Sequence, residues 1–423
     1  MKKLYLLLLM VLAACATEPE SPQLACEADH DGLTVPDGFC VIVVADSVGR
    51  ARHLVVSDNG DVYVALRHHR GGGGIAALRD TNGDGRADSI AYFGELTGTG
   101  IELRGDWLYF GSDTLIIRYA LVEDALVPAG PPEVIVGEFH DQPSHASKPF
   151  AFDAAGSMYV NIGAPANACQ DQRRAPGSPG QDPCPLLDEY AGIWRYAADT
   201  LNQDAYAHGT RYASGIRNAV ALTWHPASDQ LFVVQHGRDD LHRLWPDRFT
   251  EEQNNQLPAE ELFAVSASDD FGWPYCYWDH FNNQKLLSPE YGGDGSLVGR
   301  CASAKAPVYG FEAHWAPNDI LVYSGTQLSD HYQGGVFVAF HGSWNRSPVQ
   351  AGFEVTFLPM EGAAVAGQAE PFVSGFVGGD PVRSPGGARA RPTGLAMGAD
   401  GSLYISDSVK GRIWRVVYTG AVP

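Results

Sequence analysis

The chain has 423 residues, a formal net charge of −21 at pH 7 and a sequence pI of about 4.9. So acidic a surface would repel a phosphate backbone, and we therefore predict no nucleic-acid partner. Apolar residues make up 45% and charged residues 19%, and 48 glycines with 27 prolines punctuate the chain, which predicts a folded, turn-rich protein and excludes a disordered one.

The amino-terminal segment predicts export. Residues 1–14 begin with two lysines, continue with an apolar run and end in small residues, as a secretory signal peptide does. The Leu-Ala-Ala-Cys sequence that ends at Cys15 resembles a bacterial lipobox; the alternative is an ordinary signal peptide cut near Ala16. The resemblance implies membrane attachment by lipid at Cys15, on the periplasmic face of the outer membrane. Residues 15–25 would then be a polar tether and residues 26–423 the folded domain.

Six cysteines follow Cys15, and an even number suits disulfide bonds in an exported protein. Six cysteines allow fifteen pairings. Nearness in the sequence favours the three pairs Cys26–Cys40, Cys169–Cys184 and Cys276–Cys301. The spacing of the cysteines and histidines does not predict a zinc site.

A short pattern recurs six times along the chain: a turn, then an aromatic residue inside an alternating apolar run. The copies lie at residues 58–64, 105–110, 155–160, 228–233, 333–338 and 400–405. A period of two residues is typical of a β-strand, and most copies precede a second strand-like run. Six such units predict an all-β, six-bladed β-propeller with long inserted loops, mainly at 164–190 and 238–330. A pair of β-sandwiches is the alternative architecture.

Within the first unit, loop 80–88 has the composition of a calcium-binding loop. Its oxygen-bearing side chains are Asp80, Asn82, Asp84 and Asp88. Hard oxygen ligands on a flexible loop suit Ca²⁺, and Gly85 would permit a sharp turn. Because Ala91 stands at the twelfth position, where an EF-hand has glutamate, we place this loop between strands. A solvated hairpin loop without metal is the alternative.

Five motifs lie in the later loops. They read Ser-His-Ala-Ser-Lys at 144–148, Gly-Ile-Arg-Asn at 215–218, Asp-Asp-Phe-Gly-Trp-Pro-Tyr-Cys at 269–276, Ala-Phe-His-Gly-Ser-Trp-Asn-Arg at 339–346 and Arg-Ala-Arg-Pro-Thr-Gly-Leu at 389–395. In this order they resemble the glucose/sorbosone dehydrogenase family of quinoproteins, and most closely its L-sorbosone and pyranose dehydrogenase branch. The resemblance implies a six-bladed propeller that uses pyrroloquinoline quinone (PQQ) and Ca²⁺. It would oxidise a sugar or sugar aldehyde by hydride transfer and pass electrons to an unknown acceptor.

The resemblance also implies catalytic residues. His145 stands where the family has its base, and imidazole suits that role because its pKa lies near neutrality. Arg217 and Asn218 match a pair that lies over the quinone, where Arg217 would polarise the carbonyl that accepts hydride. The alternatives are a loop histidine bonded to nearby backbone and an arginine in a salt bridge.

Further cofactor contacts follow from the same resemblance, at Trp315, His341, Arg346, Arg389 and Arg391. Arginine guanidinium groups match carboxylates bidentately, as a cofactor with three carboxylates requires. Trp315 would stack on the quinone or on a sugar ring; loop packing is the alternative. For the arginines the alternative is surface salt bridges.

The family holds its catalytic calcium partly through two backbone carbonyls, at positions that match Gly237 and Arg238. Arg238 replaces a common proline, and Asp239 or Asp240 could add an oxygen. An ion there would act as a Lewis acid on the quinone. Two departures from the family pattern, at residues 97–100 and at Ser144, leave the identity of the sugar open.

Two other functions compete with a dehydrogenase. One is a non-catalytic propeller lipoprotein that binds carbohydrate or protein, since a fold alone does not establish an activity. The other is a metal-dependent hydrolase such as a lactonase, which would need an acidic, asparagine-rich centre. Loops that carry His145, Arg217 and Arg391 favour the dehydrogenase instead.

Overall fold

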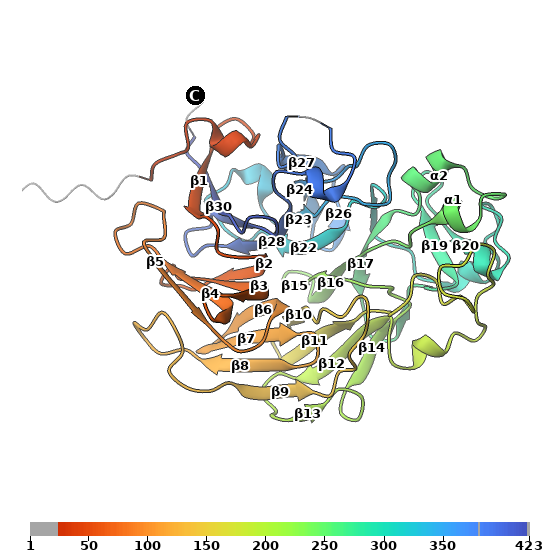
Figure 1. The fold of residues 1–423 in the computed structure, drawn as a ribbon, viewed down its shortest axis with the longest axis horizontal. Helices are drawn as coiled ribbons and strands as arrows, with labels where there is room; N and C mark the ends of the chain where they lie inside the picture. Colours follow the sequence, from red (N-terminus) through yellow and green to blue (C-terminus); the bar gives the residue numbers. More distant parts are fainter. Residues whose placement is uncertain (1–23, 380, 421–423) are drawn as a thin grey trace, which may run out of the picture.

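The structure is a computed structural model that describes residues 24–379 and 381–420. The described residues form six sheets of four or five strands, two small hairpins and only two short α-helices. Figure 1 shows the six sheets arranged around a common centre, as the blades of a propeller. The predicted six-bladed architecture is confirmed, and the paired sandwiches are excluded.

The first three blades are built as follows. Blade one contains β2 (Ala51–Val56), β3 (Val62–Arg70), β4 (Gly73–Arg79) and β5 (Ser89–Phe93). Blade two contains β6 (Gly98–Arg104), β7 (Trp107–Ser112), β8 (Ile116–Ala120), β9 (Glu133–Gly137) and, at its edge, β13 (Gln203–Asp204). Blade three contains β10 (Phe150–Phe152), β11 (Ser157–Ile162), β12 (Gly192–Ala197), β14 (Thr210–Ser214) and β18 (Asp269–Asp270).

The other three blades follow the same plan. Blade four contains β15 (Ala221–His225), β16 (Gln230–Gln235), β17 (Glu260–Val265) and β21 (Tyr309–Phe311). Blade five contains β22 (Pro317–Val322), β23 (Val336–Phe340), β24 (Glu354–Leu358) and β27 (Glu370–Val373). Blade six contains β28 (Pro392–Met397), β29 (Leu403–Asp407), β30 (Ile413–Tyr418) and β1 (Phe39–Ala45).

The insertions carry the remaining elements. They are α1 (Leu241–Leu244), α2 (Glu251–Gln256), the hairpin of β19 (Cys276–Asp279) with β20 (Gln284–Leu287), and the hairpin of β25 (Met360–Glu361) with β26 (Ala364–Val365). The 3₁₀ turns are η1 (His30–Gly32), η2 (Pro185–Asp188), η3 (Pro289–Tyr291), η4 (Gly299–Ser303), η5 (Asp330–Tyr332) and η6 (Pro385–Gly387). The predicted range 238–330 contains inserted loops together with the blade strands β17, β21 and β22. Two loops, 236–259 and 266–308, hold the extra residues.

The six repeated sequence runs form the second strands of the six blades, β3, β7, β11, β16, β23 and β29. A second strand has neighbours on both sides and neighbouring blades on both faces, so its apolar residues are buried throughout. Phe232 and Phe337, for example, are fully buried. Burial of both faces explains why this strand, among those of each blade, has the most regular sequence pattern.

The ring closes by joining the two ends of the described chain. Strand β1 pairs antiparallel with β30, with Val41 opposite Val416. The predicted disulfide Cys26–Cys40 links the segment before β1 to that strand. Of the predicted tether, only Leu24 and Ala25 are described, and Leu24 packs against Ile42 and Val417. The predicted signal peptide and Cys15 lie outside the described residues.

The other two predicted disulfides, Cys169–Cys184 and Cys276–Cys301, are also present. The first closes the long loop between β11 and β12, and the second ties β19 to η4. Across the residues 24–379 and 381–420, the helices are too short to cross a bilayer.

The strand order brings the sequence motifs to one face. Strands β2, β6, β10, β15, β22 and β28 are the innermost strands, and they contact one another around the centre (Figure 1). The first two strands of each blade are antiparallel, so the start of the innermost strand lies beside the end of the second strand. His145, Asn218 and Arg391 precede innermost strands, whereas His236 and His341 follow second strands. These residues therefore share one face of the propeller.

Candidate functional site

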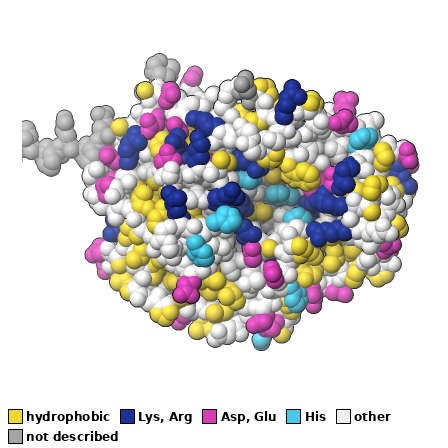
Figure 2. All heavy atoms as spheres, in the orientation of Figure 1, with side chains coloured by type: hydrophobic (Ala, Val, Ile, Leu, Met, Phe, Trp, Pro, Cys, Tyr) yellow, Lys and Arg dark blue, Asp and Glu magenta, His cyan; other side chains and the backbone are white. Residues whose placement is uncertain are grey.

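Basic and histidine side chains gather on this face although the protein is acidic. Figure 2 shows Lys, Arg and His side chains grouped around the middle of one face, with acidic side chains mainly toward its edge. The residues below make up this central site.

Arg217 lies at the bottom of the central site and is 3% exposed. Its Nη2 donates to Asp239 Oδ2 at 2.9 Å and to Asn167 Oδ1 at 3.0 Å, and its Nη1 donates to the Gly237 carbonyl at 3.0 Å. Burial lowers the pKa of Arg217, and the nearby Asp239 carboxylate opposes that shift. The salt-bridge alternative for Arg217 is thus present, inside the site and not on the surface.

Asp239 is the centre of a wider charge network. It accepts from Arg217 and, at 3.3 Å, from Arg174 Nη2, and its Oδ1 lies 3.9 Å from His314 Nδ1. Arg174 also forms a salt bridge with Asp240. Two loops that are far apart in the sequence, 163–191 and 236–259, are joined by these contacts.

Buried Glu260 fixes the loops on either side of Arg217. Its two carboxylate oxygens accept from the Gly237 amide at 2.6 Å and from the Ala316 amide at 3.0 Å. Burial raises the pKa of Glu260 to about 8. This carboxyl therefore ties the loop after β16 to the start of β22.

His145 has the geometry of a base with one defined free nitrogen. Its Nδ1 contacts the Ala164 carbonyl at 2.5 Å, and a carbonyl can only accept, so Nδ1 carries the proton. Nε2 is left with a lone pair and has no partner among the described residues. Burial lowers the pKa of His145 well below its usual 6.5, and the positive charge of Arg217 lowers it further, so the ring is neutral at pH 7.

The backbone around His145 is shaped for this position. His145 has φ of 56°, a left-handed conformation that non-glycine residues rarely adopt. Gln142 Nε2 holds the loop by donating to the carbonyls of Ser144, His145 and Gly163 at 2.8–2.9 Å. A Cβ at Gly163 would lie 2.5 Å from Asn218 Oδ1 and 2.8 Å from His145 Cβ. Glycine there allows His145 to approach Asn218 closely.

His341 and Arg391 lie together on the opposite side of the centre. Arg391 Nε donates to the His341 carbonyl at 2.8 Å, and Arg391 Nη2 donates to the Gly342 carbonyl at 3.0 Å. His341 Nε2 contacts Ser408 Oγ at 2.6 Å. Burial lowers the pKa of Arg391 to about 10. Burial and the positive charge of Arg391 lower the pKa of His341 well below 6.5, so the His341 ring is neutral at pH 7.

Arg52 is a further cation at the centre that the sequence analysis missed. Its Nε donates to Thr99 Oγ1 at 3.3 Å, and Thr99 Oγ1 lies 3.0 Å from Ser147 Oγ. Burial lowers the pKa of Arg52 to about 10, and the like charges of Arg67 and Arg391 lower it further. Within the described residues, neither Arg52 nor Arg391 has a carboxylate within salt-bridge distance.

Three predicted cofactor contacts do not reach this cluster. The Trp315 ring packs edge-on against Phe340 at 5.3 Å and lines an outer cavity between blades four and five. Arg346 donates to the Ala313 carbonyl at 3.2 Å. Arg389 lies against Gly32, where a Cβ would be 3.2 Å from its Nη1. Because the segment before β28 is not a strand, Arg389 and Arg391 do not share a side. Trp315 Nε1 and Arg389 Nε and Nη2 are buried without a hydrogen-bond partner among the described residues, and the cofactor role of all three residues stays a prediction.

The predicted catalytic calcium ligands are already engaged. The Gly237 carbonyl and the Asp239 carboxylate both accept from Arg217. The Arg238 side chain forms a buried ion pair with Glu290 and so turns away from the centre. Gly237 and Asp239 thus offer oxygens of the right kind, but an ion there would have to replace hydrogen bonds from Arg217.

The loop 80–88 does not form a ligand shell. Asp80 accepts from the amides of Gly83 and Gly85, each at 2.7 Å, and Asp88 accepts from Thr81 Oγ1 at 2.8 Å. Asn82 and Asp84 likewise accept from amides of their own loop, at 2.9 and 2.8 Å. These bonds match the solvated-hairpin alternative.

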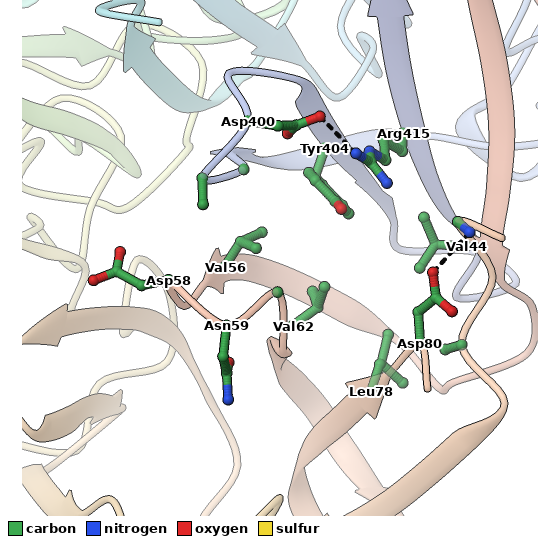
Figure 3. Close-up of a pocket in the computed structure, with 15 residues that line it drawn as sticks. Val44, Val56, Asp58, Asn59, Val62, Leu78, Asp80, Asp400, Tyr404 and Arg415 are labelled. Atoms are coloured by element: carbon green, nitrogen blue, oxygen red, sulfur yellow. Dashed lines mark hydrogen bonds and ion pairs between the residues drawn. The ribbon is translucent and has the colours of Figure 1, made fainter. Parts of the chain in front are cut away.

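A cavity beside this loop, on the face away from the central site, supports the same conclusion. Figure 3 shows its acidic residues Asp58, Asp80 and Asp400 pointing in different directions, with Asp400 bound to Arg415 at 2.6 Å. Among the described residues, no three His, Cys, Asp or Glu side chains converge on one point, so a metal site here would need backbone carbonyls or amide side chains as ligands.

Several central residues were missed because their partners are distant in the sequence. Asn167 and Arg174 belong to the predicted long loop 164–190, but their positions within it carry no spacing signal. Arg52 could have been found, because it lies at the start of an innermost strand, as Asn218 and Arg391 nearly do.

Known proteins resemble this chain in sequence and in fold. The sequence profile described as TrAA12-like matches residues 33–419. An uncharacterized protein of Borreliella burgdorferi is 30% identical over 209 residues, which are 49% of this chain and 48% of that protein. A pyrroloquinoline quinone-dependent pyranose dehydrogenase of Coprinopsis cinerea is 26% identical over 281 residues, 56% of this chain and 36% of that protein. The matches span less than half the length of these relatives.

Solved structures share the fold. The holo PQQ domain of pyranose dehydrogenase from Coprinopsis cinerea has a TM-score of 0.73 at 18% identity, covering 94% of this chain and 99% of that chain. A Trichoderma reesei structure of Carbohydrate-Active Enzymes Family AA12 has the same TM-score at 17% identity and the same coverage. The PQQ-bound aldose sugar dehydrogenase of Streptomyces coelicolor has a TM-score of 0.53 at 19% identity, over 90% of this chain and 100% of that chain.

Proposed function

The chain belongs to the TrAA12-like family, and from this premise we propose that it is a quinoprotein dehydrogenase that oxidises a sugar or sugar aldehyde. PQQ is its cofactor in this proposal, as in the name of the Coprinopsis cinerea relative. A sugar of the sorbosone or pyranose type is the proposed substrate.

The observation that carries the proposal is the pair of uncompensated guanidinium groups at the centre. Arg52 and Arg391 both have a pKa lowered to about 10 by burial. Both side chains are half-buried, and none of the described residues places a carboxylate within salt-bridge distance of either guanidinium. A cofactor with three carboxylates fits this donor set, because guanidinium groups bind carboxylates bidentately.

The chain's own residues then have defined tasks. PQQ, when bound, supplies the two-electron acceptor for hydride. His145 keeps Nε2 free to take the hydroxyl proton of the substrate, while its bond to Ala164 fixes the ring. Arg217, held by Asp239 and Asn167, brings a positive charge to the same side of the site. Ala164 links Arg217 to His145, because its backbone N–H donates to the Arg217 carbonyl at 2.7 Å and its carbonyl accepts from His145 Nδ1.

Calcium and export complete the proposal. Ca²⁺ would bind near Gly237 and Asp239 by replacing hydrogen bonds from Arg217, and the steps above do not depend on it. We also propose that the protein is exported and attached through lipid at Cys15 to the periplasmic face of the outer membrane.

Titration of PQQ into the full-length protein in detergent, with and without Ca²⁺, tests the cofactor. Reduction of a dye over a panel of pyranoses and sugar aldehydes then tests the activity. Arg52→Met and Arg391→Met should each weaken PQQ binding about tenfold or more, since each removes a charge-assisted contact. Arg195→Met is the matched control, because Arg195 is exposed on β12 and makes no salt bridge within the described residues.

Wild-type protein that binds no PQQ would contradict the proposal and favour the non-catalytic propeller. Binding that is unchanged in both variants would mean that the cofactor lies elsewhere. Circular dichroism of each variant separates loss of binding from loss of fold.

A further inference from the structure

A second cavity opens between blades one and six, on the same face as the central site, and its lining is basic. It has a volume of about 560 Å³, within the range of small-ligand sites. Its titratable side chains are Arg50, His68, His69, Arg70, Lys410 and Arg412, against the single carboxylate of Asp46. So strong an excess of positive charge is unexpected in a chain with a net charge of −21.

Most of these basic side chains form no ion pair within the described residues. Arg412 is compensated, because its guanidinium binds Asp31 at 2.6 Å and also Asp46. Arg50, Arg70 and Lys410, in contrast, form no salt bridge with any described residue. Three like charges around one cavity repel one another, and an anion bound between them would remove that cost.

Two glycines bring the basic loops together. A Cβ at Gly411 would lie 1.9 Å from the Gly49 carbonyl, so the two loops are in direct backbone contact. The Val48 amide also donates to the Gly411 carbonyl at 3.0 Å. Arg50 and Lys410, each one residue from this contact, therefore face the same cavity.

The β3–β4 hairpin supplies the third cation. The register of β3 against β4 shifts between Ala65 and Arg70, and such irregularities re-aim side chains near functional sites. Gly71 and Gly72 form the turn with φ of 57° and 89°. Arg70 is held beside the cavity by this turn.

The cavity adjoins the central site through two short links. Ser408 contacts His341 at 2.6 Å, and the next two residues line the cavity. On the other side, Arg50 lines the cavity and Arg52 lies two residues further along the same segment. A ligand that extends beyond a single sugar unit could reach from the centre into this cavity.

We propose that this cavity binds a carboxylate of an acidic oligosaccharide whose terminal unit occupies the central site. The inference rests on the proposed function and specifies its substrate as a saccharide that contains uronate units. Guanidinium and ammonium groups are the natural partners of carboxylates. The overall negative charge does not prevent binding, because salt screens distant charges beyond about 8 Å whereas the cavity cations touch the ligand.

Calorimetric titration of trigalacturonate tests the proposal, with its neutral methyl ester and inorganic phosphate as comparison ligands. Wild-type protein should bind trigalacturonate about tenfold or more tightly than the ester, and added salt should weaken only the charged ligand. In Arg50→Gln/Lys410→Gln that preference should disappear, whereas Arg195→Gln should keep it. Arg70→Gln, on the hairpin tip, is a second variant that leaves the contact of the two loops intact.

Equal affinity for the acid and its ester, or a preference that survives in both cavity variants, would overturn the inference. Phosphate that binds as tightly as trigalacturonate would also overturn it, because the cavity would then hold a small inorganic anion. Dye reduction by wild-type protein with neutral monosaccharides separates the two proposals. A protein that oxidises those sugars but shows no preference for the acid retains the proposed function and loses only this inference.

Discussion

His145 combines three features that general-base catalysis requires, and each has a physical cause. The bond from Nδ1 to Ala164 fixes the tautomer, burial and Arg217 keep the ring neutral by lowering its pKa, and a left-handed backbone places the residue against Gly163, which also borders Asn218. The combination of a fixed tautomer and a free nitrogen, and not the backbone conformation alone, distinguishes His145 from the other non-glycine residues with positive φ.

His145→Ala should therefore retain PQQ binding and lower kcat for sugar oxidation by about 10²–10⁴-fold. The reason is that the variant removes the proton acceptor and leaves the arginines in place. Stopped-flow dye reduction with saturating sugar measures the effect. His208→Ala is the control, because His208 is exposed and contacts only the Asp204 amide of its own turn. Turnover that is unchanged in His145→Ala would exclude this residue as the base.

Motif order predicted some of the central residues, and others could not be predicted from it. His145, Arg217, Asn218, His341 and Arg391 stand in short motifs and meet at the centre. Trp315, Arg346 and Arg389 also stand in or beside such motifs, but a side chain's direction depends on local backbone that the motif does not specify. Arg52 and Asn167 act through partners about fifty residues away, beyond the reach of a local pattern.

Glu102, on the innermost strand of blade two, makes stability depend on pH. This residue lies on the innermost strand β6, makes no hydrogen bond with a described side chain, and burial raises its pKa from the usual 4.5 to about 8. Between these values the folded protein holds a proton that the unfolded chain has released. The free energy of unfolding therefore falls as pH rises from about 4.5 to about 8.

Glu102→Gln should remove this dependence. We expect the variant to be more stable than wild type by about 4 kcal/mol at pH 8 and nearly equal to it at about pH 4, since a neutral amide has no proton to lose. Urea unfolding at both pH values measures the difference. An increase in the free energy of unfolding that is the same at pH 4 and pH 8 would show that the buried charge of Glu102 is not its cause.

At the scale of elements, regular strands were predictable and the inserted loops were not. A turn followed by an apolar run with an aromatic residue located all six second strands, and burial of both faces accounts for the nearly continuous apolar run. The loop 163–191 carries Asn167 and Arg174 yet has no periodic pattern. Its shape depends on the Cys169–Cys184 disulfide and on a bond of 3.0 Å from Trp273 Nε1 to the Asn167 carbonyl.

Replacing both cysteines of that pair by serine should loosen the loop and weaken PQQ binding, because Asn167 helps to hold Arg217. Closing a loop of 15 residues contributes about 3 kcal/mol to stability. The matched control replaces Cys26 and Cys40, which are 14 residues apart and lie in the segment before and within β1. Both double variants should lose similar stability by thermal melting, and only the first should lose affinity for PQQ. Equal losses of affinity would mean that the effect is global.

At the scale of the whole molecule, the number of blades followed from the repeats, and the family predicted from the motifs is confirmed. Neither the repeats nor the motifs predicted how the ring closes. The closing pair, β1 with β30, joins residues nearly 400 positions apart, and β1 shows no repeat signal of its own. Charge distribution was likewise hidden, because a net charge of −21 gives no sign of the basic residues that the fold collects on one face.

Closure by the chain ends makes a prediction about cooperativity. Val41 is fully buried on β1 and faces Val416, so Val41→Ala should cost about 2 kcal/mol through lost packing. Because β1 fastens the last blade to the ring, we expect the whole domain to become less stable, with one urea transition that is shared by tryptophan fluorescence and far-ultraviolet circular dichroism. Val122→Ala, at a residue that is 51% exposed, should change stability by less than about 0.5 kcal/mol. Two separated transitions in Val41→Ala would instead mean that blade six can detach while the other five remain folded, and that the β1–β30 pair closes the ring without carrying its stability.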